Sequence, residues 1–250
     1  MNFYNRALIF FIALATLSLL FAHYATAQKK SQHPYASVQP ITEPRLFAEG
    51  IINIDGEEYG PTFTPDGKTI FFARRINERK MEHIFVSQSE NGKWSTPVVA
   101  PFSGQYFDKE PFVSPDGKKI FFVSKRPVDP ASEKKDFNVW VVEKTKSGWS
   151  APQNVGPMVN SDGYDNYPAV AANGTLYFGS VRASGQGDGD LLISFNKSGK
   201  WTVPQSLGPK INTSEYEYTP LVSPDKKYLF FSSGWGKIYQ IDMSALNLKP

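Results

Sequence analysis

The chain repeats one pattern, in which a polar turn leads directly into an unbroken apolar run. One example is SPDGKKIFFV at 114–123. Apolar and polar residues do not alternate in these runs, so they predict short strands that are covered on both faces of a sheet. Copies of the pattern open with a proline and its apolar neighbours, at Pro61, Pro111, Pro168 and Pro220.

The spacing of the copies predicts the fold. The opening prolines at 61, 111, 168 and 220 are 50, 57 and 52 residues apart. Each of the first three copies holds four strand-sized segments, the last of them beside a tryptophan at 94, 149 or 201. A repeat of this length predicts an all-β fold, a β-propeller of four-stranded antiparallel blades that begin near residues 58, 108, 165 and 217.

The residues between the first two strands of each copy have the chemistry of a hairpin turn. Proline presets φ for the second turn position, aspartate suits the third, and glycine adopts the left-handed conformation of a type I turn with a bulge. Lys226 replaces this glycine in the last copy, so we expect that turn to be the most strained. The predicted turn residues are Asp66, Gly67, Asp116, Gly117, Asn173, Gly174 and Asp225.

The fourth copy lacks the tryptophan segment, and a similar segment stands at the other end of the repeats. EPRLFAEGIIN (43–53) is similar to APQNVGPMVN (151–160) and VPQSLGPKIN (203–212). We therefore expect the N-terminal segment to supply the outer strand of the last blade, which would close the ring and protect its edges. The alternative is an open arc that a second chain completes.

These phrases resemble a known repeat. P-x-x-SPDGK-x-I-x-F, the following S-x-R, and W-S-x-P-x-x-x-G-x-x-[IV]-N are similar to the WD40-like (PD40-type) repeat of TolB-like β-propellers. The resemblance covers residues 43–242. It implies a propeller of the kind found in exported bacterial proteins, and by analogy a binding role in the cell envelope.

The N-terminus predicts export. Asn5 and Arg6 precede an apolar run at 7–22, and the small residues Ala25-Thr26-Ala27 follow, as in a signal peptide cleaved before Gln28. A retained membrane anchor is the alternative reading of this run. We expect a signal peptide at 1–27, a flexible leader at 28–42 and the propeller domain at 43–250. The mature chain would have no membrane span and would be periplasmic or extracellular.

Composition excludes several kinds of chemistry. The chain has no cysteine, so it has no disulfide, thiolate nucleophile or cysteine zinc site. Of its three histidines only His83 lies in the repeats, which excludes a histidine triad. Without the predicted signal, 27 − 1 = 26 basic residues face 24 acidic ones, and this balance does not favour nucleic-acid binding. We predict no catalytic residue set, no metal and no cofactor.

An acid stands three residues before every opening proline. These acids could form a ring that binds a cation or acts as a glycosidase pair. Because all copies share them, we instead expect structural acids that cap backbone amides. They are Glu58, Asp108, Asp165 and Glu217.

Five residues outside this pattern are candidate ligand-binding residues. Arg126 and Arg182 occupy equivalent positions, with Arg75 displaced by one, and they would either clamp an anion or pair with the acid of a neighbouring blade. Trp235 has no counterpart in the other copies and is a candidate stacking platform. Asp188 and Asp190 lie in the glycine-rich loop 182–190, which together with 126–136 interrupts the repeat.

The sequence therefore favours a non-enzymatic, exported binding propeller whose partner is an envelope protein or peptide. The alternative is a glycan-binding or glycoside-hydrolysing propeller that uses paired carboxylates. A third possibility is a repeat protein that acts only through self-association.

Overall fold

The structure is a computed structural model of the 250-residue chain. It describes residues 34–35, 42, 46–54, 57–76, 80–129, 131, 136–182, 185–223, 225–234, 237–246 and 248. The chain divides into two units, Met1–Glu43 and Pro44–Pro250. The predicted signal peptide and nearly all of the predicted leader lie outside the described residues. Within the described residues, no helix is long and apolar enough to cross a membrane.

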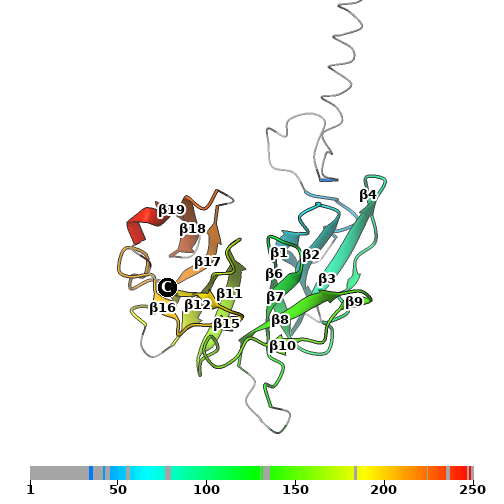
Figure 1. The fold of residues 1–250 in the computed structure, drawn as a ribbon. Helices are drawn as coiled ribbons and strands as arrows, with labels where there is room; N and C mark the ends of the chain where they lie inside the picture. Colours follow the sequence, from blue (N-terminus) through cyan, green and yellow to red (C-terminus); the bar gives the residue numbers. More distant parts are fainter. Residues whose placement is uncertain are drawn as a thin grey trace, which may run out of the picture. The chain divides into compact units, whose positions relative to one another are not determined.

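The second unit is all-β, and its antiparallel sheets are arranged as a four-bladed β-propeller (Figure 1). Blade 1 consists of β1 (Glu57–Phe63), β2 (Thr69–Ile76), β3 (Met81–Glu90), β4 (Lys93–Trp94) and β5 (Val98–Val99). Blade 2 consists of β6 (Asp108–Val113), β7 (Lys119–Ser124), β8 (Asn138–Thr145), β9 (Gly148–Trp149) and β10 (Gln153–Asn154).

Blades 3 and 4 continue the same order. Blade 3 consists of β11 (Tyr164–Val170), β12 (Leu176–Val181), β13 (Asp190–Ser194) and β16 (Gln205–Ser206), with the small hairpin β14 (Asn196–Lys197) and β15 (Lys200–Trp201). Blade 4 consists of β17 (Glu217–Val222), β18 (Tyr228–Ser233) and β19 (Lys237–Asp242), and a 3-10 helix, η1 (Met243–Leu246), follows it. The predicted fold class and the predicted order of blades are confirmed.

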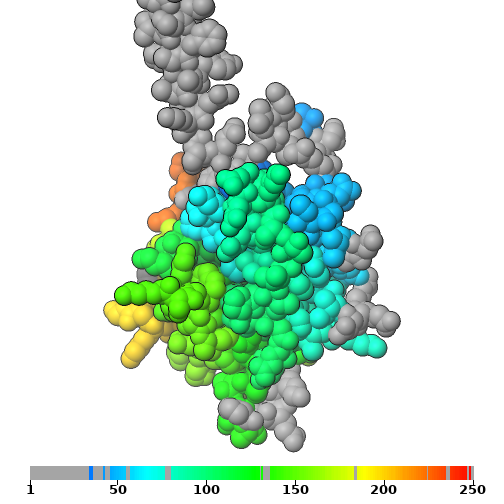
Figure 2. Space-filling model, turned by 90° about the vertical axis from the view of Figure 1, so that its right-hand side faces the viewer, coloured from blue at the N-terminus to red at the C-terminus, as the bar shows by residue number. Residues whose placement is uncertain are grey.

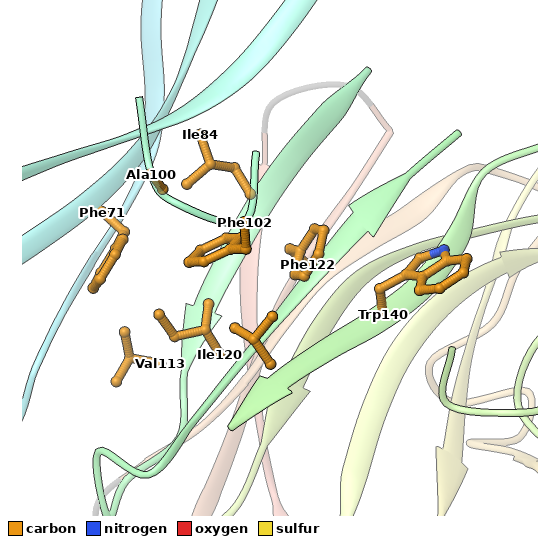
Figure 3. Close-up of a cluster of buried hydrophobic side chains, with 9 residues drawn as sticks. Phe71, Ile84, Ala100, Phe102, Val113, Ile120, Phe122 and Trp140 are labelled. Atoms are coloured by element: carbon orange, nitrogen blue, oxygen red, sulfur yellow. The ribbon is translucent and has the colours of Figure 1, made fainter. Parts of the chain in front are cut away.

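The core lies between consecutive blades, which explains the unbroken apolar runs. Between blades 1 and 2, Phe71 and Ile84 of one sheet meet Ile120 and Phe122 of the next (Figure 3). Successive residues of one strand face opposite sides of the sheet, so Phe121 packs into the next cluster, between blades 2 and 3. Every apolar residue of such a run is therefore buried in blades 1 to 3, whereas Phe230 of blade 4 is only partly buried.

The hairpin turns are held by their aspartates. The Asp66 carboxylate accepts bonds from Thr64 Oγ1 (2.6 Å) and from the amide of Lys68 (3.0 Å). Asp116 and Asp225 do the same in their copies. The hydroxyl bond is the main cause that lowers the pKa of these carboxyl groups. The glycine position is left-handed throughout, and in blade 4 Lys226 takes this conformation with φ of 60°.

The innermost strand of every blade carries a bulge at its opening proline. The residue before this proline has a positive φ in all four blades: Gly60 (62°), Glu110 (53°), Tyr167 (51°) and Thr219 (52°). The pairing register shifts at the same place in each blade. Strand β1 borders β6, β6 borders β11, and β11 borders β17. The bulges therefore recur where consecutive blades meet at their inner strands.

The predicted closing strand is the one feature of the fold that the structure corrects. In the described residues, the sheet of blade 4 ends at β19, and the segment 46–54 joins blade 1 instead. Phe47 and Ile52 pack there against Ile70 and Phe72. Figure 2 shows this segment in blue beside the cyan surface of blade 1. The segment stays on blade 1 because Ile52 is buried there and its carbonyl accepts a bond from Arg74 Nη2 (3.0 Å).

Candidate functional site

The predicted repeat acids lie at the start of the inner strands, and their side chains are turned into the protein. Asp165 accepts bonds from the Ser161 amide (2.6 Å) and from Ser180 Oγ (2.6 Å). Glu217 accepts bonds from the Thr213 amide (3.0 Å) and from Ser233 Oγ (2.8 Å). Each carboxylate therefore fastens the segment that enters a blade to the blade's own second strand.

Arg126 and Arg182 are part of the same arrangement. Arg126 Nη2 lies 2.8 Å from Asp108 Oδ1, and Arg182 Nη2 lies 2.8 Å from Asp165 Oδ1. Both ion pairs are inside one blade, so the expected pairing with a neighbouring blade's acid is wrong. Each guanidinium also donates to a carbonyl of the preceding connection, Phe102 O (3.0 Å) or Val159 O (2.8 Å). Neither arginine is presented as an open anion clamp.

In blade 1 the equivalent arginine is Arg74, not Arg75. Arg74 Nε bonds Glu58 Oε1 (2.8 Å), and its Nη2 bonds the Ile52 carbonyl, as Arg126 and Arg182 bond theirs. The prediction that Arg75 is the displaced counterpart was wrong. The side chain of Arg74, and not that of Arg75, lies on the face of the sheet where Glu58 can be reached, and sequence spacing alone does not show this. Arg75 instead bonds Glu82 (2.8 Å) and Glu57 (2.5 Å), and these bonds raise its pKa.

The remaining ligand-binding candidates are not brought together. Asp188 is exposed on its loop, whereas Asp190 is buried and accepts bonds from the amides of Gln186 (2.8 Å) and Gly187 (3.3 Å). Trp235 lies outside the described residues. Among the residues that the structure describes, no group of three or more His, Cys, Asp or Glu side chains could hold a metal ion.

A cluster around Glu110 was not found from the sequence. Glu110 is buried between blades 2 and 3, where its carboxylate accepts a bond from the Tyr167 amide (2.8 Å) and pairs with Lys109 Nζ (2.9 Å). Burial is the main cause that raises the pKa of Glu110, although Lys109 opposes it. The left-handed φ of Glu110 places it on the bulge of β6, which recurs in the other three blades.

Tyrosines surround this carboxylate. Tyr59 Oη donates to Glu82 Oε2. Burial is the main cause that raises the pKa of Tyr59, and the bond to Glu82 and the charges of Glu82 and Glu110 add to it. The rings of Tyr167 and Tyr218 are in contact in a tilted arrangement, with centroids 5.6 Å apart. Because burial also raises the pKa of Tyr167, the hydroxyls of Tyr59 and Tyr167 remain protonated donors at neutral pH. The sequence signal that could have shown the cluster is the residue before each opening proline, which differs in every copy.

A pocket of about 320 Å³ lies beside the predicted functional loop 126–136. The Asn154 amide is fixed there, because its Oδ1 accepts bonds from the Gly156 amide (2.8 Å) and from Asn160 Nδ2 (3.0 Å). Its Nδ2 is buried and has no partner among the described residues. The pocket is lined by Val128, Asp136, Asn138, Asn154, Pro157, Asn160 and Ser161.

Solved structures with a similar fold were found. TolB from Acinetobacter baumannii matches with a TM-score of 0.50 and 16% identity, over 76% of this chain and 42% of TolB. A Mycobacterium tuberculosis puromycin-hydrolyzing peptidase matches with a TM-score of 0.53 and 14% identity, over 77% of this chain and 28% of the peptidase. A thermostable family-43 glycoside hydrolase matches with a TM-score of 0.43 and 16% identity, over 71% of this chain and 64% of the hydrolase.

No protein-family model matches the chain, and no curated protein matches it in sequence. The chain spans less than half the length of TolB or of the peptidase. At these identities the likeness shows the propeller fold, TolB-like among others, and leaves the assignment to the PD40-type repeat as a prediction. Function is therefore argued from the site itself.

Proposed function

We propose that this chain is a non-enzymatic binding module of the bacterial cell envelope that holds a protein or peptide segment in the pocket beside loop 126–136. The predicted signal peptide and the TolB-like fold support export to the periplasm or beyond. The observation that carries the proposal is the buried, unpartnered amide nitrogen of Asn154 in a pocket whose other members are largely polar.

The chemistry of the pocket fits a peptide. A buried donor without an acceptor costs about 1–3 kcal/mol, and a ligand carbonyl that reaches it would recover this energy. Asn138 adds an amide group that suits a peptide backbone, whereas the side chains of Asn160 and Ser161 are engaged in bonds within the protein. Val128 is 58% exposed and offers an apolar contact for a side chain of the ligand. Polar groups of this kind set orientation, while the apolar contact adds affinity.

The other charged residues support binding over catalysis. The repeat acids and Arg74, Arg126 and Arg182 are engaged in bonds that hold the blades. Their periodic arrangement maintains the scaffold, whereas the pocket occurs at a loop that the repeat does not require. This contrast is typical of proteins that carry function on loops.

The test is capture of a partner from an envelope extract by the tagged chain after mild cross-linking, followed by mass spectrometry. Val128→Asp should remove the partner, because it places a charge in the apolar part of the pocket. Val98→Asp is the matched control, since Val98 is similarly exposed on blade 1. A partner that both variants retain, or no partner at all, would contradict the proposal.

A glycan-binding or glycoside-hydrolysing role is the second candidate, and one observation favours it. Glu82 and Glu110 both act on the Tyr59 hydroxyl, and burial raises the pKa of Glu110, the direction of shift that a general acid needs. Two carboxylates of this kind are the machinery of glycosidases.

This role would place the chemistry in the Glu110 cluster rather than on the repeat acids. Hydrolysis or binding of envelope glycans that Glu110→Gln abolishes and Val128→Asp leaves intact would support it. The reverse pattern, or no effect of either variant on glycans, would reject it.

A further inference from the structure

In the part of the chain that the structure describes, the side of blade 4 that faces away from blade 3 is uncovered. We call it the forward face of blade 4, and it comprises Leu221, Phe230, Ile238 and Gln240. By strand register, Ile238 is the equivalent of Ile84, Val139 and Leu191. Each pairs with the residue that lies two positions after an aromatic residue of the second strand, namely Phe71, Phe121, Tyr177 or Phe230. Those three residues are 0% exposed, whereas Ile238 is 78% exposed.

The equivalent residues are covered by the segment that leads to the next blade. Asn160 Oδ1 accepts a bond from the Val139 amide (2.8 Å), and Asn160 Nδ2 donates to the Val139 carbonyl (3.0 Å). Asn212 makes the same two bonds to Leu191, both of 2.9 Å. In blade 1, Ser103 Oγ accepts the bond from the Ile84 amide (3.0 Å). In each case a side chain of the connecting segment is thus bonded to the backbone of the buried residue on the third strand. We call this bonding the clamp.

Asn53 has the same local structure but no strand to clamp. Asn160 and Asn212 donate to the side chain six residues earlier, Asn154 or Ser206, and Asn53 Nδ2 donates six residues back as well, to the Phe47 carbonyl (2.6 Å). The residues before Asn53 and Asn160, Ile52 and Val159, each accept a bond through their carbonyl from an arginine of the following blade. Among the described residues, Asn53 makes no bond to a third strand.

A second equivalence points to the same pair of surfaces. Trp149 of blade 2 packs edge-on against Phe71 of blade 1 (6.0 Å between ring centroids), and Trp201 packs against Phe121 in the same way (6.2 Å). By register, Phe230 is the counterpart of Phe71 and Phe121. Its missing partner would correspond to Trp94 of a blade 1.

We propose that the forward face of blade 4 docks head to tail onto blade 1 of a second copy of this chain, with Asn53 clamping the Ile238 backbone and Trp94 covering Phe230. The two surfaces of this interface resemble those that meet at the three interfaces between consecutive blades of one chain. An interface between unlike surfaces of two copies is heterologous and forms a closed ring or an open chain of molecules.

The structure favours a second copy over closure within one chain. Asn53, Trp94 and Ile238 are all present in the same molecule, yet β1 and β17 do not form the border that the other consecutive inner strands form. Bringing them together would require the three packed interfaces between blades to rotate, and such interfaces resist deformation. Two copies can use both surfaces as they stand.

The absence of cysteine makes a direct test possible. Asn53→Cys and Ile238→Cys are made in separate chains of the full sequence, purified as the host processes them, mixed and treated with a short bis-maleimide. We expect a cross-linked dimer of one chain of each kind. A mixture of Asn53→Cys with Val98→Cys is the control, because Val98 is also exposed but lies outside the proposed interface.

The double variant Asn53→Cys/Ile238→Cys distinguishes the alternatives. A linkage within one chain at low concentration would overturn the proposal in favour of ring closure. It would be seen as a monomer whose mass has increased by the mass of one cross-linker. Cross-linking in neither experiment would overturn it as well. In light scattering of the unmodified chain, Ile238→Asp should lower the mean mass to that of the monomer while Val98→Asp leaves it unchanged. Equal masses for all three proteins would also count against the proposal.

Discussion

At the scale of single residues, the pair of Asp108 and Arg126 is the most stringent test of how the blades are held. Asp108 is fully buried, and Arg126 satisfies it together with Ser103 Oγ (2.8 Å). Asp108→Asn leaves a buried guanidinium without its counter-charge, so we expect the free energy of unfolding to fall by about 3–5 kcal/mol. Urea unfolding with an unchanged slope measures this loss.

The exposed pair of Lys119 and Glu143 provides the control. Its atoms are 2.7 Å apart, but both side chains are about half exposed. Solvent screening limits such a pair to about 0–1 kcal/mol, so Glu143→Gln should scarcely change the urea midpoint. Similar losses in the two variants would contradict a structural role for the buried pair.

Glu110 predicts how stability depends on pH. Burial raises the pKa of its carboxyl group in the folded state, so the folded protein holds this proton more tightly than the unfolded chain does. The stabilisation is complete below the unfolded pKa of about 4.3 and is lost as the pH rises through the folded value. Glu110→Gln should therefore flatten the fall of the urea midpoint between pH 4 and the neutral range.

The aspartates of the hairpin turns act in the opposite direction. Their pKa is lowered, so their stabilisation is present above the unfolded pKa and is lost as the pH falls through the folded one. Glu143→Gln is again the control for Glu110→Gln, since it removes an exposed carboxylate. If the midpoint of Glu110→Gln fell with pH as steeply as that of the unmodified chain, Glu110 would not be the cause.

Predictions about single residues succeeded where the bonding partners are close in sequence. They failed where the partner depends on the face of the sheet towards which a side chain points. The turn aspartates follow from neighbours two residues away, so the sequence was sufficient to place them. The partner of Arg126 depends on which strand its side chain faces, and spacing alone misassigned both that partner and the role of Arg75. Glu110 was missed because its burial arises from blade 3, far away in the sequence.

At the scale of elements, the turn of blade 4 carries the strain expected from its sequence. Lys226 has φ of 60°, where a Cβ atom is unfavourable by about 1–2 kcal/mol. Lys226→Gly should therefore stabilise the protein, by about 1 kcal/mol after the entropy that glycine adds to the unfolded chain. The melting temperature and the urea midpoint should both rise.

Gly174 offers the reverse experiment in blade 3. It has φ of 82°, and an added Cβ would meet only Asn196 Cβ at an ordinary 3.7 Å. Gly174→Lys should thus lose stability through its backbone conformation rather than through a clash. If neither substitution changed stability, the left-handed conformation would not be the source of strain in these turns.

The strands themselves were predictable, because each unbroken apolar run requires cover on both faces. The position of the segment 43–53 in the fold could not be predicted in this way. Its likeness to the segments that close blades 2 and 3 predicts the outer strand of blade 4, but those segments contact two blades at once. In this chain the described part of the segment lies on the blade that follows it, and the strand that should precede it remains open.

At the scale of the whole molecule, this open edge predicts uneven protection of backbone amides. The Val139 amide is bonded to Asn160, whereas the Ile238 amide of the equivalent strand has no partner among the described residues. In dilute solution, β19 should therefore exchange hydrogen much faster than β8, because local opening is cheapest where few bonds and contacts hold a strand. Mass spectrometry of peptides that cover the two strands measures both rates.

Concentration then connects this edge to the proposed assembly. If blade 4 docks onto a second copy, exchange in β19 should slow as the protein concentration rises, while β8 stays unchanged. Asn53→Ala should weaken this effect, since it removes the clamp but leaves Trp94 and β19 intact. Slow exchange of β19 at every concentration would instead mean that one chain covers its own edge, because protection that arises from association must follow mass action.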